Sequence, residues 1–228
     1  MERRVETPTA TNDIDPLLDG LGRTRPNQNA RPQTRPRPPS PSEVRHDTDA
    51  NDDECVHVKD YGYFNPNGQH TGAYARFCEK ANLEGGSKAL NSIYPPAWPA
   101  DLEDGRSGNP KIGSSYKYSH CHLIADKLGG SGKNPDNLIT CLQKPVNSPV
   151  MRGREKEVGD AVRDGQIVDY WVTPIYNRGS AMPNKIHIVA RGRYKDGAPG
   201  INLDRCIINR VRSAATDKWK VDYPGGFC

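Results

Sequence analysis

All six cysteines and every Phe, Tyr and Trp of the 228-residue chain lie beyond residue 54. The first 54 residues instead contain the proline- and arginine-rich run RTRPNQNARPQTRPRPPSPSEVR, followed by the acidic run HDTDANDDE. A segment of this composition cannot bury enough apolar surface to offset the entropy that it loses on ordering. We therefore predict that residues 1–54 are a disordered arm with an acidic linker, and that residues 55–228 form the folded domain.

The cysteines of the predicted domain indicate an oxidising destination. None of the six belongs to a Cys-x-x-Cys pair, and this pattern suits three disulfides better than a zinc ribbon. Because disulfides persist outside the reducing cytosol, a secreted, extracellular protein is expected. The start, MERRVETPTATNDIDPLL, lacks the apolar core of a secretory signal, which leaves export by another route or excision from a longer polypeptide.

Charge and hydropathy give only broad limits on the partners. No segment approaches the roughly 20 apolar residues that cross a bilayer, so membrane insertion is not expected and the molecule should be soluble. The formal net charge is +4, a mild lean toward polyanionic partners that proteins of many functions share.

Glycine and proline interrupt the predicted domain every few residues, which favours short strands and long loops. Apolar or alternating runs predict strands at 116–124, 137–143, 168–176 and 185–192, and a strand and turn in the aromatic run YGYFNPNG. Helices are expected at 75–83 and 146–165, with an irregular proline-rich stretch at 92–115. These elements predict an α+β fold, in which helices and long loops accompany an antiparallel sheet.

The run YKYSHCHLI places two histidines on one face of a strand. Successive strand side chains point to opposite faces, so His120 and His122 lie on the same face and Cys121 points away. Three interpretations compete: a zinc site of His120, Cys121 and His122, a catalytic histidine, or an ordinary strand end. The zinc site is disfavoured because Cys121 faces away and no second ligand pair follows at zinc-finger spacing.

One face of the predicted helix carries a glutamate among apolar residues. Four side chains recur at helical spacing and a fifth extends the line by one turn: Met151, Glu155, Val158, Val162 and Asn147. Glutamate is rarely buried without a partner, so Glu155 in this stripe indicates a cation, an arginine or metal-bound water opposite. The other interpretation remains open, in which Ser148 and Pro149 start the helix and Glu155 lies at the edge of the stripe.

The stretch YSHCHLIADKLGGSGKNPDNLITCLQKPVNSPVMRGRE combines these features in one order. It contains a histidine followed by Leu-Ile, a Leu-Gly-Gly-Ser-Gly loop, an Asn-Leu strand, and then an asparagine and a glutamate on the next helix. In this order the motifs resemble the core of the DNA/RNA non-specific endonucleases. The resemblance is strongest over residues 116–157, extends loosely from about residue 55 to TPIY, and implies a ββα-metal (His-Me finger) core.

The resemblance also implies roles for single residues. It makes His122 the general base, Asn147 the direct protein ligand of one Mg²⁺ ion, and Glu155 the holder of metal-bound water, with Mn²⁺ able to substitute. A neutral imidazole can take a proton from water near pH 7, and magnesium prefers oxygen ligands and keeps several waters. Asn147 and Glu155 are eight residues apart, roughly 12 Å along a continuous helix, which is too far for both to bind one ion directly.

The sequence departs from the family pattern at one point. Several relatives have an arginine two residues before the base, often as Asp-Arg-Gly-His, and His120 occupies that place here. Whether His120 assists the phosphate as a cation is left open. The missing charge could come from Arg152 or Arg154 on the helix, or from Arg106 in the preceding loop.

The resemblance to a ββα hairpin also pairs Cys121 with Cys141 across adjacent strands. Proximity in sequence adds Cys55–Cys78 and Cys206–Cys228 to the expected disulfides. The glycines at 129, 130 and 132 are interpreted as the turn that returns the chain to the second strand.

The leading hypothesis is a Mg²⁺-dependent endonuclease that hydrolyses phosphodiester bonds of DNA and RNA and grips the phosphate backbone rather than base edges. It would be secreted, or the toxin part of a secretion-system effector, and an immunity protein in the producer is left open. The alternative is a catalytically weakened nucleic-acid-binding module on the same fold. The presence of His122, Asn147 and Glu155 together argues against that alternative.

Overall fold

The computed structural model describes residues 38–41, 55–99, 108–210 and 221–228. All of these belong to the compact unit Thr34–Cys228, whereas the unit Met1–Gln33 lies outside the described residues. Most of the predicted arm and Arg106 also lie outside them. Within the predicted arm, residues 38–41 are described and Pro38 is buried.

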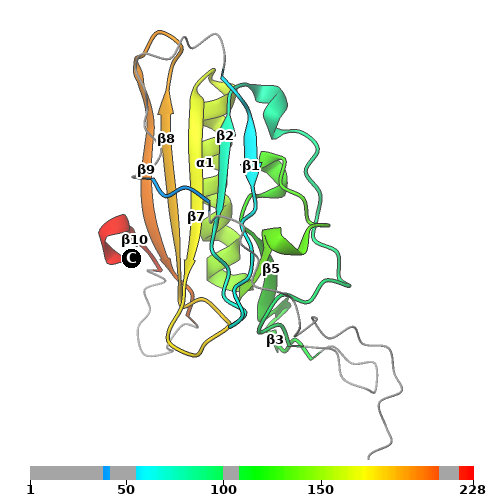
Figure 1. Cartoon of the computed structure of the whole chain (residues 1–228). Helices are drawn as coiled ribbons and strands as arrows, with labels where there is room; N and C mark the ends of the chain where they lie inside the picture. The colour runs from blue at the N-terminus through cyan, green and yellow to red at the C-terminus, as the bar shows by residue number, and fades with distance from the viewer. Residues whose placement is uncertain (1–37, 42–54, 100–107, 211–220) are drawn as a thin grey trace, which may run out of the picture. The chain divides into compact units, whose positions relative to one another are not determined.

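A six-stranded antiparallel sheet forms the larger layer (Figure 1), in the order β1-β2-β7-β8-β9-β10. Its strands are β1 (Val58–Asp60), β2 (Ala73–Phe77), β7 (Ile167–Ile175), β8 (Lys185–Arg193), β9 (Pro199–Ile208) and β10 (Asp222–Pro224). The helix α1 (Arg152–Arg163) packs against β7, β8 and β9 on one face, and the apolar core lies between these two layers. Alternate residues of β7, such as Val168, Tyr170 and Val172, enter this core because successive strand side chains point to opposite faces.

The predicted ββα core is present beside the large sheet. Strand β5 (Tyr118–His122) pairs antiparallel with β6 (Leu138–Leu142), and an irregular helical segment, Gln143–Met151, leads from β6 into α1. Met151, Val158 and Val162 are fully buried, as their helical spacing predicts. The α+β fold with a ββα core is therefore confirmed. No helix in the described ranges is long and apolar enough to cross a membrane.

The predicted continuous helix 146–165 is wrong at its start. Ser148 has extended backbone angles (φ −137°, ψ 122°) and interrupts the helical segment before α1. The residue before a proline is disfavoured in the helical region, which explains the break at Ser148. Asn147 thus lies in a separate turn, so its separation from Glu155 does not follow the roughly 12 Å rise of a continuous helix.

Two other predicted elements also differ. The expected helix 75–83 is mostly the strand β2, followed by a 3-10 turn at Lys80–Leu83, because β2 is paired on both sides, with β1 and β7. The aromatic run at 61–64 forms only a single bridge between Phe64 and His70. The strand expected at 116–124 is divided into β4 (Ser115–Tyr116), which pairs with β3 (Lys111–Ile112), and β5.

All three expected disulfides are formed: Cys55–Cys78, Cys121–Cys141 and Cys206–Cys228. Cys121 and Cys141 are diagonal rather than directly opposite, because Cys121 pairs with Ile139 and Cys141 with Ser119. The other two bridges attach the short edge strands, β1 and β10, to their neighbours β2 and β9.

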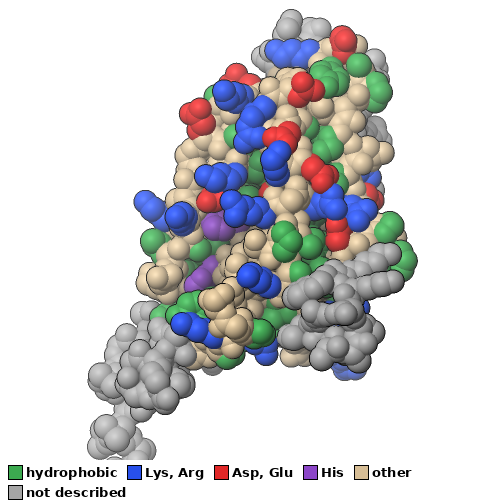
Figure 2. All heavy atoms as spheres, turned by 180° about the vertical axis from the view of Figure 1, so that it is seen from behind, with side chains coloured by type: hydrophobic (Ala, Val, Ile, Leu, Met, Phe, Trp, Pro, Cys, Tyr) green, Lys and Arg blue, Asp and Glu red, His purple; other side chains and the backbone are tan. Residues whose placement is uncertain are grey.

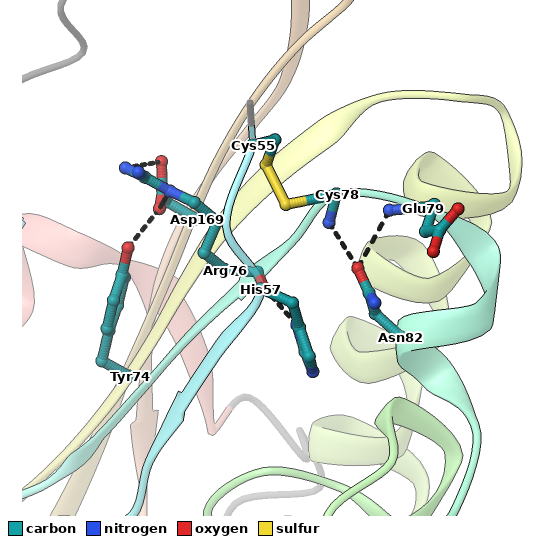
Figure 3. Close-up of a disulfide and its surroundings, with 8 residues drawn as sticks. All are labelled: Cys55, His57, Tyr74, Arg76, Cys78, Glu79, Asn82 and Asp169. Atoms are coloured by element: carbon teal, nitrogen blue, oxygen red, sulfur yellow. Dashed lines mark hydrogen bonds and ion pairs between the residues drawn. A yellow bond between two sulfur atoms is a disulfide. The ribbon is translucent and has the colours of Figure 1, made fainter. Parts of the chain in front are cut away.

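A charged cluster is buried within the sheet (Figure 3). The carboxylate of Asp169 accepts hydrogen bonds from the Arg76 guanidinium (2.8 and 3.2 Å) and from the Tyr74 hydroxyl (2.5 Å). Asp169 is fully buried, and these donors satisfy a charge that would otherwise be costly to remove from water.

Candidate active site

A cleft of about 1040 Å³ opens between β5, the segment 88–98, the β3–β4 hairpin and the start of α1. Four of the five residues predicted for catalysis line it: His120, His122, Asn147 and Glu155. The fifth, Arg154, does not. Residues from distant parts of the sequence therefore meet at one concave surface.

A backbone carbonyl fixes the tautomer of the His122 ring. Its Nε2 lies 3.0 Å from the carbonyl oxygen of Ser87. A carbonyl oxygen can only accept, so in the neutral imidazole Nε2 carries the proton and Nδ1 keeps a lone pair. Burial lowers the pKa of His122 below its ordinary value, while the Ser87 carbonyl and the Asp126 carboxylate partly oppose this shift. The side chain is therefore neutral at pH 7, with Nδ1 as its proton acceptor.

The glycine loop after β5 fixes the carbonyl that orients His122. The backbone N–H of Gly132 donates to the Ser87 oxygen (3.0 Å), and the N–H of Ser87 donates to the oxygen of Gly130 (3.0 Å). Gly129 has φ +74° and makes the predicted turn. Gly130 and Gly132 serve a second purpose that the sequence interpretation missed. A Cβ on Gly132 would lie 2.2 Å from the backbone carbon of Lys88, so only glycine permits this approach.

The side-chain amide nitrogen of Asn147 is hydrogen-bonded, whereas its side-chain oxygen is not, within the described residues. Its Nδ2 donates to Ser119 Oγ (2.9 Å) and to Gln143 Oε1 (3.1 Å), so both amide hydrogens are used. The Oδ1 atom accepts no hydrogen bond within the described residues. An amide side chain held in this way offers its oxygen as a neutral ligand.

Glu155 shares the cleft with a second carboxylate. The pKa of Glu155 is raised to about 8, mainly by burial and also by the nearby Asp126 carboxylate, while Arg152 partly opposes the shift. Asp126 lines the same cleft, and the sequence interpretation did not single it out. The sequence could have indicated Asp126 as a site residue, because it follows His122 by four positions in the loop that leaves β5. The Asp126 carboxylate disfavours the ionised form of Glu155 unless a cation is near.

His120 points into the cleft but is held differently. Its Nε2 lies 2.7 Å from the oxygen of Ile93, and its ring stacks on Trp98 with ring centroids 3.7 Å apart. Burial lowers the pKa of His120, and the neighbouring His122 lowers it further, while the Ile93 carbonyl opposes the shift. The lowered pKa favours the neutral ring of His120 near pH 7.

The two helix arginines lie on different sides of α1. Arg154 forms hydrogen bonds and ion pairs with Asp222 and with Glu157, away from the cleft. Arg152 lines the cleft beside Glu155, together with Lys88 and Lys127. Figure 2 shows the reverse side of the molecule, where Lys and Arg side chains gather around histidine side chains. Of the two helix candidates for the missing charge, only Arg152 is in position.

Comparison with known proteins shows a similarity over this site. Residues 99–193, which include the cleft residues of β5 and α1, match the family model described as DNA/RNA non-specific endonuclease. This part of the chain is therefore similar to the DNA/RNA non-specific endonucleases. The family match supports a nuclease.

Two solved structures resemble the chain. A structure of Sda1 nuclease with bound zinc ion aligns with a TM-score of 0.52 and 22% identity, over 68% of this chain and 74% of that one. This likeness shows the fold. An extracellular endonuclease aligns with a TM-score of 0.48 and 12% identity, over 74% of this chain and 87% of that one. No curated protein matches the chain.

The cleft offers oxygen donors of the kind that a hard divalent cation such as Mg²⁺ prefers. Cys121 is bonded to Cys141, which removes the thiolate that the alternative zinc site needs. No three His, Cys, Asp or Glu side chains of the described residues group as a metal site. The same cleft is lined by Asn147, Glu155 and Asp126, whose side chains carry amide and carboxylate oxygens.

Proposed function

We propose that this chain is a magnesium-dependent, sequence-non-specific endonuclease that hydrolyses phosphodiester bonds of DNA and RNA. The main support for the proposal is the orientation of the His122 ring. The Ser87 carbonyl holds its Nε2, which leaves Nδ1 as a proton acceptor in a cleft that Asn147 and Glu155 also line. The family match of residues 99–193 supports the same activity.

In this proposal His122 is the general base. Its Nδ1 takes a proton from a water molecule as the water oxygen bonds to phosphorus, and the bond from phosphorus to the leaving sugar oxygen breaks. A neutral imidazole is required at the start of this step, and burial keeps His122 neutral at pH 7. The bond from Nε2 to Ser87 stabilises the imidazolium that forms, because a carbonyl oxygen favours the charged ring.

We assign Asn147 as the direct protein ligand of the metal ion and Glu155 as a residue that holds it through water, with Mn²⁺ as a possible substitute for Mg²⁺. The oxygen atoms that Asn147, Glu155 and Asp126 bring to the cleft support this assignment. When bound, such an ion supplies positive charge that stabilises the phosphorane-like transition state and the leaving oxygen. Arg152, Lys88 and Lys127 add positive charge on the protein side of the cleft, which attracts the phosphate backbone without reading sequence.

The proposed location is extracellular, and three disulfides support it. A role as the toxin part of a secretion-system effector stays within this proposal, and an inhibitor protein in the producing cell would follow from that role. Residues 1–54 remain a proposed arm that takes no part in the chemistry.

Incubation of the full chain with supercoiled plasmid and with end-labelled RNA tests the proposed function. We expect nicking and RNA cleavage in MgCl₂, no cleavage in EDTA, and a loss of cleavage in His122→Ala. Binding of both nucleic acids without cleavage in Mg²⁺ or Mn²⁺ would instead establish the binding module and reject the enzyme.

A further inference from the structure

Four aromatic side chains line the cleft, and the proposed chemistry uses none of them. They are Tyr94, Trp98, Tyr116 and Tyr118. Tyr94 is 54% exposed and Tyr116 is 48% exposed, although both are large apolar rings. Rings left open to solvent at a concave surface beside charged residues are typical of a ligand-contact surface.

Trp98 is presented to the cleft as a fixed flat ring. It stacks on His120 with an interplanar angle of 24°, two residues from the proposed base. Its segment is attached to the ββα hairpin twice, because Ile93 accepts a hydrogen bond from His120 (2.7 Å) and Pro96 accepts one from Thr140 (2.9 Å). The ring therefore cannot move away without breaking contacts to β5 and β6.

The backbone directly before Trp98 is strained. Ala97 has φ +63°, in the left-handed region that residues with a Cβ rarely adopt. Such strain persists only where the surrounding structure imposes it, and it collects at functional sites. Here it accompanies the turn that places Trp98 against His120.

Lysine side chains accompany the tyrosine rings on this wall. The Nζ of Lys111 lies 5.3 Å from the centroid of the Tyr116 ring, and the Nζ of Lys117 lies 5.0 Å from that of Tyr118. Aromatic rings next to cations are the combination that binds single-stranded nucleic acid, in which bases stack on rings and phosphates meet the charges.

The geometry points to a stacking subsite for unpaired nucleobases on this wall of the cleft, with Trp98 and Tyr116 as its platforms. This inference rests on the proposed function, because the cleft must hold a phosphodiester chain. Every base has a flat aromatic face, so the subsite tolerates any sequence. A base inside a duplex is already stacked on both faces and must leave its helix first. Single-stranded DNA or RNA, or an unpaired segment, is therefore the preferred substrate.

Equilibrium binding in EDTA tests the subsite without any cleavage. The probes are a fluorescent single-stranded oligonucleotide, a hairpin duplex of the same composition, and a chain of equal length made of abasic tetrahydrofuran phosphates. We expect the full chain to bind the single strand most tightly. In Tyr116→Ala and Trp98→Ala, the preference for the single strand over the base-free chain should fall by about 5- to 150-fold, the range for one lost stack.

Matched variants separate ring stacking from other effects. Tyr116→Phe and Trp98→Phe keep a ring and should retain most of the preference. Phe227→Ala removes another exposed ring (59%), in the 3-10 turn Gly225–Phe227 and outside the cleft lining, and should leave the preference unchanged.

The two proposals fail in different ways. Equal affinity of the full chain for the base-containing and base-free chains would overturn the stacking subsite, as would variants that weaken both affinities equally. Cleavage of the same probes after Mg²⁺ is added is a separate readout. Its absence would reject the proposed nuclease, while the binding preference would still decide for or against the subsite.

Discussion

His122 and His120 each direct Nε2 to a backbone carbonyl, yet we expect their removal to have different consequences. His122→Ala should lower kcat by about 100- to 10,000-fold, because a general base contributes on that scale, and added imidazole should restore part of the rate. His120→Ala should cost less, since a ring that only packs on Trp98 takes no proton. Kinetics on a short oligonucleotide check this, with circular dichroism as the control for folding. The assignment is wrong if His120→Ala is the inactive variant and His122→Ala is not.

Asn147 and Glu155 should differ in how strongly they affect metal binding. Asn147→Ala should raise the Mg²⁺ concentration for half-activity by about 100-fold, and Glu155→Ala by about 10-fold, as expected for a residue that acts through water. Electron paramagnetic resonance of added Mn²⁺ measures the same affinities without turnover. Unchanged Mn²⁺ affinity in Asn147→Ala would remove that residue from the metal site.

The paired arginines of α1 provide an internal comparison. Arg152→Ala should lower kcat/KM by roughly 100-fold, because it removes a positive charge from the cleft. Arg154→Ala removes contacts to Asp222 and Glu157 instead. It should therefore lower the unfolding midpoint and have little effect on kcat/KM. Equal kinetic losses in both variants would show that the charge acts at long range and not from the cleft wall.

The glycine loop is an element whose geometry should control the base. Gly132→Ala places a Cβ within 2.2–2.3 Å of backbone atoms of Lys88 and Ala89, so this segment must shift and move the Ser87 carbonyl with it. We expect a fall in kcat and a changed pH profile for His122, because the bond that fixes its tautomer is disturbed. Gly153→Ala is the control, since its Cβ meets no atom within 4 Å and alanine favours helices. Normal kcat in Gly132→Ala would show that the Ser87 carbonyl does not need this loop.

The elements that the sequence predicted well are those with a clear local pattern. Strands β7 and β8 and the buried face of α1 follow apolar periodicity, which the tertiary structure does not override. Strand β2 was mistaken for a helix because its pairing partners, β1 and β7, are not visible in a local window. The choice between Arg152 and Arg154 could have been made, since Arg152 is three residues from Glu155 and shares its helix face. The contact between Gly132 and Ser87 could not have been predicted from the sequence, because it joins residues 45 positions apart.

Over the whole molecule, stability against acid should depend on His70. This side chain is only 3% exposed, and both ring nitrogens are engaged, Nε2 with the oxygen of Asp136 (2.7 Å) and Nδ1 as acceptor from the N–H of Gly72 (2.9 Å). The ring thus joins the turn before β2 to the loop before β6 in its neutral form. Burial lowers the pKa of His70 from 6.5 to about 4.

The sign of the pH dependence follows from this lowered pKa. Between pH 6.5 and 4 the unfolded chain binds a proton at His70 that the folded chain does not, so the free energy of unfolding falls as the pH falls, by up to about 3 kcal/mol. Glu155, whose pKa is raised, acts in the opposite direction, so each pH must be compared between the full chain and His70→Gln. Urea unfolding from pH 4 to pH 7 should show that the stability lost in His70→Gln, relative to the unaltered chain, is largest at pH 7 and shrinks as the pH falls toward 4. Parallel curves would mean that His70 has the same pKa in the folded and the unfolded chain, which would contradict the lowered pKa.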